Sequence, residues 1–286
     1  MLRLASSNVD EAFDGEAEMR QRILITGASS GLGAALARHY AGPDCLLILW
    51  ARDPARLEAV AADCRRAGAA VEIRSLDLVD SAAAIATINE EDAAGAIDIA
   101  VLAAGLGDIQ SMAERAEDPA RVVSLGLVNF VTPSAMAAAL AGRMAARGQG
   151  RIILIGSAAA FHALPFAAAY AGSKAGLARF AQALRIGVAP HGVQIMLASP
   201  GPIDTPAGRA VPAPAWLTMQ PADVAARIAR ASAQGRFHLT LPWPFALLRV
   251  IDRLLPDRLR NALLAGLRPA SPPAQPAGWR DGAGPG

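Results

Sequence analysis

The chain has 286 residues, a net charge of +2 and a hydrophobic content of 53%. This length suits one α/β domain with extensions at both ends, and the apolar fraction is enough for a large core. The low charge and the lack of basic clusters interleaved with aromatic residues exclude a typical nucleic-acid-binding protein. Cys45 and Cys64 are isolated, the four histidines are scattered, and neither set has the spacing of metal ligands.

The N-terminal segment, residues 1–20, is acidic and shows little periodicity, so we expect a mobile arm. It lacks the apolar core of a signal peptide. No run reaches the roughly 18 apolar residues of a membrane span. Together with two unpaired cysteines, these features predict a cytoplasmic protein.

Strand-like and helix-like segments alternate from residue 21 to residue 242, as a doubly wound parallel sheet requires. We expect a Rossmann-type α/β fold in this range, with about seven strands in the order 3-2-1-4-5-6-7 and helices on both faces. Pro133 is expected to kink or to start a helix in the long Ala-rich region. The predicted strands cover residues 22–26, 46–51, 71–75, 97–105, 151–156, 193–201 and 237–242, and the predicted helices 34–42, 54–68, 81–95, 118–147, 166–188 and 220–235.

A glycine-rich turn, TGASSGLG (26–33), lies between the first predicted strand and the first helix. Gly27 permits a tight turn, while Gly31 and Gly33 allow close approach of a phosphate and close packing of helix on strand. The N-terminus of the following helix supplies free N–H groups for an anion. This arrangement is typical of dinucleotide binding; the alternative is an ordinary strand-to-helix loop.

A second motif joins Ser157, at the end of the apolar run RIILIGS, to Tyr170 and Lys174. Lys174 is the only lysine in a chain with 26 arginines. Tyr170 and Lys174 are spaced i, i+4 and share a helix face, so the ammonium is expected to lower the pKa of the phenol and prepare it for acid–base chemistry. The Ser157 hydroxyl can hold a substrate oxygen. The alternative is a surface tyrosine with a cation nearby.

These motifs, in this order, resemble the short-chain dehydrogenase/reductase family in its single-domain branch, over residues 21–242. The resemblance rests on TGASSGLG, on Ser157, Tyr170 and Lys174 at the family's spacing, on Asn129 in LGLVNFVTP, on Asp77 in SLDLVD, and on the Pro-Gly loop SPGPIDTP (199–206). One departure is the run Leu102-Ala103-Ala104-Gly105, where the family usually has Asn-Asn-Ala-Gly. We expect this change to alter local hydrogen bonding rather than activity.

The resemblance implies hydride transfer between a nicotinamide and a carbonyl or secondary alcohol, with Asn129, Ser157, Tyr170 and Lys174 as the catalytic residues. Tyr170 would be the general acid/base, Lys174 would also hold the nicotinamide ribose, and Asn129 would position a water that links Lys174 to solvent. The implied cofactor-binding residues are Gly27, Ser29, Ser30, Gly31, Leu32, Gly33, Arg52, Asp77, Leu78, Ala104, Gly105, Tyr170, Lys174, Pro200, Gly201, Ile203 and Thr205.

The residues after the second predicted strand favour NADP(H) over NAD(H). Arg52 follows Ala51 at the place where an acidic residue would read the ribose 2′-hydroxyl. A guanidinium can hold a 2′-phosphate with two hydrogen bonds. Asp53 is contrary evidence, unless it caps the helix that Pro54 opens.

Apolar side chains dominate the loops expected near the site, which span residues 106–112, 158–166 and 206–219. They predict a small hydrophobic ketone, aldehyde or alcohol as substrate; the alternative is that these loops pack on one another. The expected substrate-binding residues are Ser157, Phe161, Leu164, Phe166, Tyr170 and Trp216.

Residues 243–267 form a C-terminal extension with apolar residues at helical spacing and several arginines, divided by Pro256. Three interpretations remain: peripheral membrane contact, a lid or subunit contact, and docking on the domain's own core. Residues 268–286 are rich in Pro, Gly and Ala and are expected to be disordered. The family resemblance also suggests a homodimer or homotetramer.

Two other functions compete with a dehydrogenase. A non-catalytic dinucleotide-binding sensor or scaffold would not need Ser157. A nucleotide-sugar epimerase or dehydratase would carry differently spaced glycines and a larger C-terminal substrate domain, and this sequence has neither.

Overall fold

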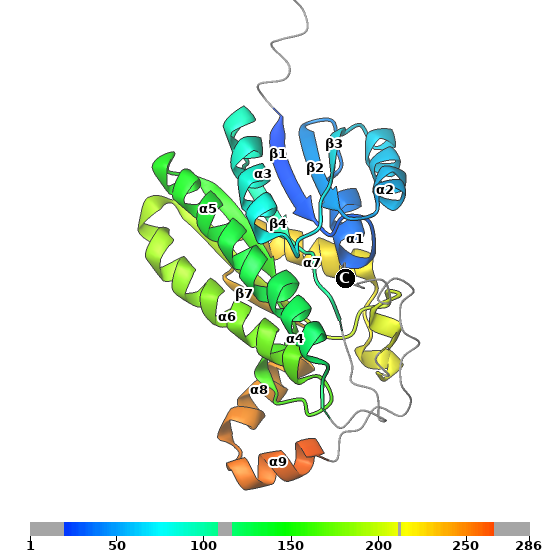
Figure 1. Ribbon diagram of the computed structural model, residues 1–286, viewed down its shortest axis with the longest axis vertical. Helices are drawn as coiled ribbons and strands as arrows, with labels where there is room; N and C mark the ends of the chain where they lie inside the picture. The colour runs from blue at the N-terminus through cyan, green and yellow to red at the C-terminus, as the bar shows by residue number, and fades with distance from the viewer. Residues whose placement is uncertain (1–19, 108–115, 211–212, 266–286) are drawn as a thin grey trace, which may run out of the picture.

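The computed structural model describes residues 20–107, 116–210 and 213–265. The expected arm at residues 1–20, except Arg20, lies outside the described residues. The same holds for the expected tail at 268–286 and most of the loop at 106–112. The described chain forms one parallel sheet covered by helices on both faces (Figure 1).

The sheet has seven strands in the order β3-β2-β1-β4-β5-β6-β7, which confirms the predicted fold class and strand order. Every strand pair is parallel. The fourth strand is shorter than the predicted range 97–105. The strands are β1 (Gln21–Thr26), β2 (Cys45–Ala51), β3 (Ala70–Ser75), β4 (Ile99–Leu102), β5 (Gly150–Ile155), β6 (Val193–Pro200) and β7 (His238–Leu241).

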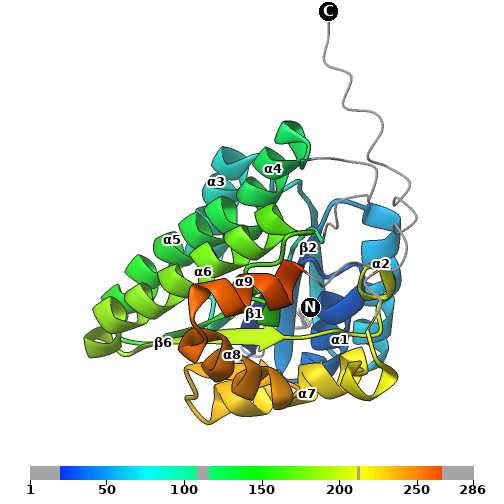
Figure 2. The ribbon, with the colours of Figure 1, turned by 90° about the horizontal axis from the view of Figure 1, so that it is seen from below.

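Two helical layers bury the aliphatic faces of these strands, and each layer has its own apolar core. One layer contains α1, α2 and α7, and the other contains α3, α5 and α6 (Figure 1). The C-terminal helices α8 and α9 lie beyond the carboxyl ends of the strands (Figures 1 and 2). The helices are α1 (Gly31–Tyr40), α2 (Pro54–Arg66), α3 (Ser81–Ala94), α4 (Pro119–Gly126), α5 (Thr132–Ala146), α6 (Ala168–Val188), α7 (Pro221–Ala233), α8 (Pro244–Leu254) and α9 (Asp257–Ala265).

Three helices begin at an aspartate whose side chain accepts a hydrogen bond from the first turn. Asp53 caps α2, Asp80 caps α3 and Asp118 caps α4, with distances of 2.9–3.0 Å to the backbone nitrogens. Such caps satisfy N–H groups that have no partner within the helix. Asp53 therefore has the capping role that the sequence offered as one alternative.

The predicted helix 118–147 is continuous in space but changes its hydrogen bonding in the middle. Residues Leu127–Val131 form a π-helical turn, η2, and the N–H of Thr132 bonds to the carbonyl of Leu127. Pro133, which has no N–H, lies in the first turn of α5 directly after η2, where the hydrogen bonding of the helix changes. The wider turn carries Asn129, which is fully buried. Single π turns are frequent at functional sites.

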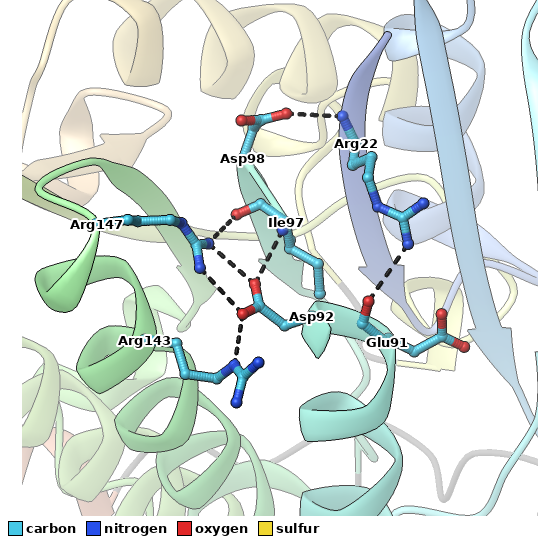
Figure 3. A network of polar contacts seen from close by, with 7 residues as sticks. All are labelled: Arg22, Glu91, Asp92, Ile97, Asp98, Arg143 and Arg147. Atoms are coloured by element: carbon cyan, nitrogen blue, oxygen red, sulfur yellow. Dashed lines mark hydrogen bonds and ion pairs between the residues drawn. The ribbon is translucent and has the colours of Figure 1, made fainter. Parts of the chain in front are cut away.

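A buried ion-pair network joins α3 to α5 near the amino edge of the sheet (Figure 3). The carboxylate of Asp92 is 2% exposed and accepts hydrogen bonds from Arg143 and Arg147. It also accepts from the backbone N–H of Ile97 at 2.9 Å. Burial alone would raise the pKa of Asp92, but the hydrogen bonds from Arg147 and Arg143 outweigh it and lower that pKa.

One helical run in the described part of the chain, Pro119–Ala146, is long and apolar enough to cross a membrane. Its α5 portion buries Met136, Leu140 and Met144 completely in the core of the domain. This burial accounts for its apolar character. Among the described residues, no group of acidic, histidine and cysteine side chains has the arrangement of a metal site.

Candidate active site

A cleft of about 230 Å³ opens at the carboxyl ends of the central strands. Ligands of doubly wound sheets bind at this edge, where the strand order reverses between β1 and β4. Ten predicted cofactor-binding residues line the cleft: Gly27, Ser29, Ser30, Leu32, Gly33, Arg52, Asp77, Leu78, Ala104 and Gly105. The predicted set omitted seven further residues that line the cleft: Thr26, Trp50, Ala51, Leu76, Ala103, Leu106 and Val128. The available signal was their position next to strand ends or to Asn129.

The glycines of the turn sit where a side chain would collide with backbone. A Cβ on Gly27, which has φ +69°, would lie 2.7 Å from Cα of Ala104, and one on Gly33 would lie 2.2 Å from the carbonyl oxygen of Gly27. The hydroxyl of Thr26, at the end of β1, accepts a hydrogen bond from the N–H of Ala104 at 3.1 Å. The strand ends are therefore close-packed around an open cradle, as a dinucleotide requires.

The N-terminus of α1 faces this cradle with uncapped N–H groups. Ser30 is the N-cap residue, yet its hydroxyl makes no capping hydrogen bond. The first N–H groups of a helix lack partners within it and carry partial positive charge. This end of α1 therefore fits a pyrophosphate.

Arg52 lies at the rim of the cleft opposite Asp77. Its side chain is 63% exposed, and its Nη1 lies 4.0 Å from a carboxylate oxygen of Asp77. Because this distance is longer than a hydrogen bond, most N–H donors of Arg52 can bind a ligand in the cleft. The neighbouring Asp53 is occupied in capping α2.

Lys174 is buried in α6, with 4% of its surface exposed. Its Nζ donates a hydrogen bond of 3.0 Å to the carbonyl oxygen of Ile155 at the end of β5. A Cβ placed on Gly105 would lie 3.3 Å from this Nζ, so the ammonium reaches the wall of the cleft. Burial lowers the pKa of Lys174 to about 8.

Tyr170 and Ser157 are brought together across the gap between α6 and β5. The Ser157 hydroxyl interacts with the Tyr170 phenol closely enough to lower its pKa, and the Ser157 oxygen accepts a hydrogen bond from the N–H of Ala159 at 3.1 Å. Burial raises the pKa of Tyr170, and the interaction with Ser157 offsets this only in part. The expected lowering of this pKa by Lys174 is therefore wrong, because burial dominates the shift.

Asn129 links two segments of the site through its side chain. Its Oδ1 accepts from the N–H of Leu106, and its Nδ2 donates to the carbonyl of Leu106, both at 2.8 Å. Nδ2 also lies 3.3 Å from the hydroxyl of Ser173. The side chain thus fastens the segment after β4 to α6, and the expected contact with a water stays a prediction.

The loop after β6 reaches back to the glycine turn. The methyl carbon of Thr205 lies 3.4 Å from the position of a Cβ on Gly31. Ile203 forms a bridge with Met219. Pro200 ends β6, and Gly201 follows it under the ring of Phe245, where a Cβ would approach the ring to 2.5 Å.

Only some of the residues expected to bind substrate lie close to the site. Phe161, Leu164 and Phe166 are partly buried and follow Ser157 in the chain. The ring of Phe161 packs against His238 and under the guanidinium of Arg249, which lies 4.1 Å from its centre. Trp216 is 74% exposed and is not part of the cleft wall.

Comparison with known proteins shows one family. The model of the short chain dehydrogenase family matches residues 21–215. An oxidoreductase of Myxococcus xanthus is 30% identical over 88% of this chain and 100% of its own. A second oxidoreductase, Rv2073c of Mycobacterium tuberculosis, is 34% identical over 82% of this chain and 93% of its own. A short-chain dehydrogenase from Sphingobium yanoikuyae, solved with NADPH, superposes with a TM-score of 0.71 at 27% identity, covering 88% of this chain and 98% of its own.

Proposed function

Since the chain belongs to the short-chain dehydrogenase family of oxidoreductases, we propose that it is an NADP(H)-dependent enzyme with Tyr170 as general acid/base. Its reaction interconverts a carbonyl and a secondary alcohol on an apolar substrate. The catalytic domain spans residues 21–242. The observation that carries the proposal is the convergence of the Ser157 hydroxyl, the Tyr170 phenol and the buried ammonium of Lys174 where α6 meets the end of β5.

The hydroxyl groups of Ser157 and Tyr170 have different roles at the substrate oxygen. A bound nicotinamide supplies the hydride chemistry. The Ser157 hydroxyl donates a hydrogen bond to the carbonyl oxygen and polarises it, and Tyr170 gives that oxygen its proton. In the opposite direction, the phenolate form of Tyr170 takes the proton from the alcohol. Because burial holds the pKa of Tyr170 high, the phenol is protonated at neutral pH and ready to act as the acid.

Lys174 and Asn129 position this pair. The ammonium uses one of its three donors on the carbonyl of Ile155, and the other two are free for the nicotinamide ribose hydroxyls. Asn129 holds the segment at Leu106 against α6 through three hydrogen-bonding contacts. These contacts keep the cleft wall and the catalytic helix in one arrangement.

Three observations support NADP(H) as the cofactor. Arg52 lines the cleft and keeps its donors exposed. Asp53, which would favour the 2′-hydroxyl of NAD, serves as a helix cap. The similar Sphingobium enzyme was solved with NADPH.

The test is NADPH consumption by the purified protein with a panel of apolar ketones, comparing wild type with Tyr170→Phe. We expect turnover in the wild type and a loss of at least about 100-fold in the variant. NADPH affinity, measured by fluorescence titration, is expected to stay within about twofold, because the ring is kept. Turnover retained in Tyr170→Phe would remove Tyr170 from the mechanism. Tight NADPH binding without turnover on any ketone would favour the non-catalytic sensor.

A further inference from the structure

The C-terminal helices expose a large apolar surface. Eight of the fourteen exposed large hydrophobic residues in the described part of the chain lie between residues 243 and 263. They are Trp243, Leu247, Leu248, Val250, Ile251, Leu254, Leu259 and Leu263, with exposed fractions of 45–77%. We call these eight residues the C-terminal apolar face. A cluster of this kind on a folded domain marks an interaction surface.

The orientation of α8 is fixed by contacts on its other side. Arg249 bonds to the ring of His238 at 3.0 Å and covers Phe161. Asp252 lies 3.6 Å from the Nδ1 of His162, and Phe245 rests on Gly201. The helix therefore turns charged residues toward the domain and aliphatic residues away from it, the reverse of an ordinary surface helix.

The charge and length of this segment indicate the kind of partner. Residues 243–265 contain four arginines and two aspartates, a net charge of +2. Arg249 faces the domain and Arg260 pairs with Asp257, whereas Arg258 is exposed on α9. An anionic surface would attract this exposed cation. The helices, with 11 and 9 residues, are too short to span a bilayer. Trp243 at the start of α8 is a residue type enriched at the headgroup level.

We propose that the C-terminal apolar face lies on the surface of a lipid bilayer that contains anionic lipid. Helices α8 and α9 lie at the carboxyl edge of the sheet (Figures 1 and 2), and α8 contacts the 3-10 turn η3 (Ala158–Phe161), which follows Ser157. The bilayer then adjoins the end of the molecule that holds the cleft. This placement gives apolar substrates dissolved in the bilayer a short route to Tyr170, an inference that rests on the proposed function.

Sedimentation of the full chain with sucrose-loaded vesicles tests the proposal. We expect wild type to bind phosphatidylcholine vesicles containing about one third phosphatidylglycerol, and to bind pure phosphatidylcholine roughly tenfold more weakly. Leu247→Glu/Leu254→Glu is expected to reduce binding at least about tenfold. Ile186→Glu is the matched control, because Ile186 is 69% exposed on α6, and we expect it to bind as wild type does.

A second variant tests the proposal even if Leu247→Glu/Leu254→Glu misfolds. Arg258 is exposed on α9, and Arg258→Gln is expected to weaken binding only to the anionic vesicles. Tyr170→Phe is expected to bind vesicles fully, which separates this proposal from the proposed function. No sedimentation of wild type, or equal loss in Ile186→Glu, would overturn the proposal. So would a dimer in analytical ultracentrifugation that Leu247→Glu/Leu254→Glu converts to monomer, because a second copy would then occupy the face.

Discussion

Lys174 and Ile155 are joined by a hydrogen bond of 3.0 Å from the ammonium to the last carbonyl oxygen of β5. Ser157 lies two residues beyond this carbonyl, and Tyr170 lies one helical turn before Lys174 on α6. The bond therefore sets the helix that carries the phenol against the strand that leads to the serine. Lys174 can act on the site both as a charge and as a tie between α6 and β5.

The low pKa of Lys174 predicts a pH-dependent affinity for NADPH. Burial places this pKa at about 8, so the ammonium is charged below pH 8 and loses its charge above it. If the charged form holds the dinucleotide, the dissociation constant is expected to rise above pH 8 by up to about tenfold per pH unit. Fluorescence titration between pH 7 and pH 9.5 measures this. Lys174→Met is expected to bind weakly with a flat profile, and a flat wild-type profile would contradict the role of the charge.

Arg52 is expected to determine the choice between NADPH and NADH. Arg52→Ala removes the guanidinium that can hold the 2′-phosphate, and we expect NADPH affinity to fall roughly tenfold or more while NADH affinity changes little. Titration of both dinucleotides measures the ratio. Arg56→Ala is the control, since the Arg56 side chain on α2 is 72% exposed against 63% for Arg52 and lies 3.6 Å from Asp53. Equal loss of both dinucleotides in Arg52→Ala would refute the selectivity.

Gly33→Ala is expected to damage the dinucleotide cradle. The new Cβ would lie 2.2 Å from the carbonyl oxygen of Gly27, so α1 must shift away from β1, at a cost of about 1–3 kcal/mol in the free energy of unfolding. We also expect loss of NADPH binding. Gly142→Ala on α5 is the control, because nothing lies within 4 Å of its Cβ position, and it is expected to stabilise the protein by about 0.5–1 kcal/mol. Urea unfolding compares the two.

The Asp92 network is expected to matter for stability rather than for chemistry. Asp92→Asn leaves Arg143 and Arg147 beside a neutral partner. Because their side chains stay 38% and 22% exposed, we expect the free energy of unfolding to fall by about 1–3 kcal/mol. Asp63→Asn is the control, since Asp63 pairs with Arg38 at the surface, where solvent screens the pair and its loss has little effect on stability. Equal effects of the two substitutions would show that burial of Asp92 has no energetic consequence.

His238 predicts a loss of stability on acidification. Burial first, and Arg249 second, lower the pKa of His238 from 6.5 to about 4. Between these pH values the unfolded chain binds a proton that the folded chain does not, so the free energy of unfolding falls as the pH drops from 6.5 to 4. Allowing for solvent screening, we expect about 1–2 kcal/mol from this residue.

Urea unfolding at pH 7 and at pH 4.5 measures this effect in wild type and in His238→Gln. The variant is expected to lose less stability over this interval, whereas substitution of the exposed His191 by glutamine is expected to leave the loss unchanged. An identical pH dependence in wild type and His238→Gln would show that His238 is not the group responsible.

The sheet could be predicted from sequence because aliphatic runs such as 151–156 read as buried strands and glycine turns mark their ends. The cradle at Gly27 and Gly33 could be predicted for the same reason. The π turn at Asn129 could not be predicted, because its wider hydrogen bonding depends on packing against α6 and the segment at Leu106. The orientation of α8 could not be predicted either, since periodicity identifies an apolar face but not whether that face points toward the domain or away from it. The direction of the Tyr170 pKa shift was not predicted, because burial, a tertiary effect, outweighs the charge of a neighbour.

The sole lysine of the chain has a consequence for labelling. Lys174 is 4% exposed, so apart from the α-amino group the folded protein presents no amine to acylating reagents in solution. Acylation of Lys174 requires either entry of the reagent through the wall of the cleft or separation of α6 from β5, and each event adds one fixed mass to the chain. The rate of that mass change reports how often this ammonium becomes accessible, at a single position and without any engineered probe.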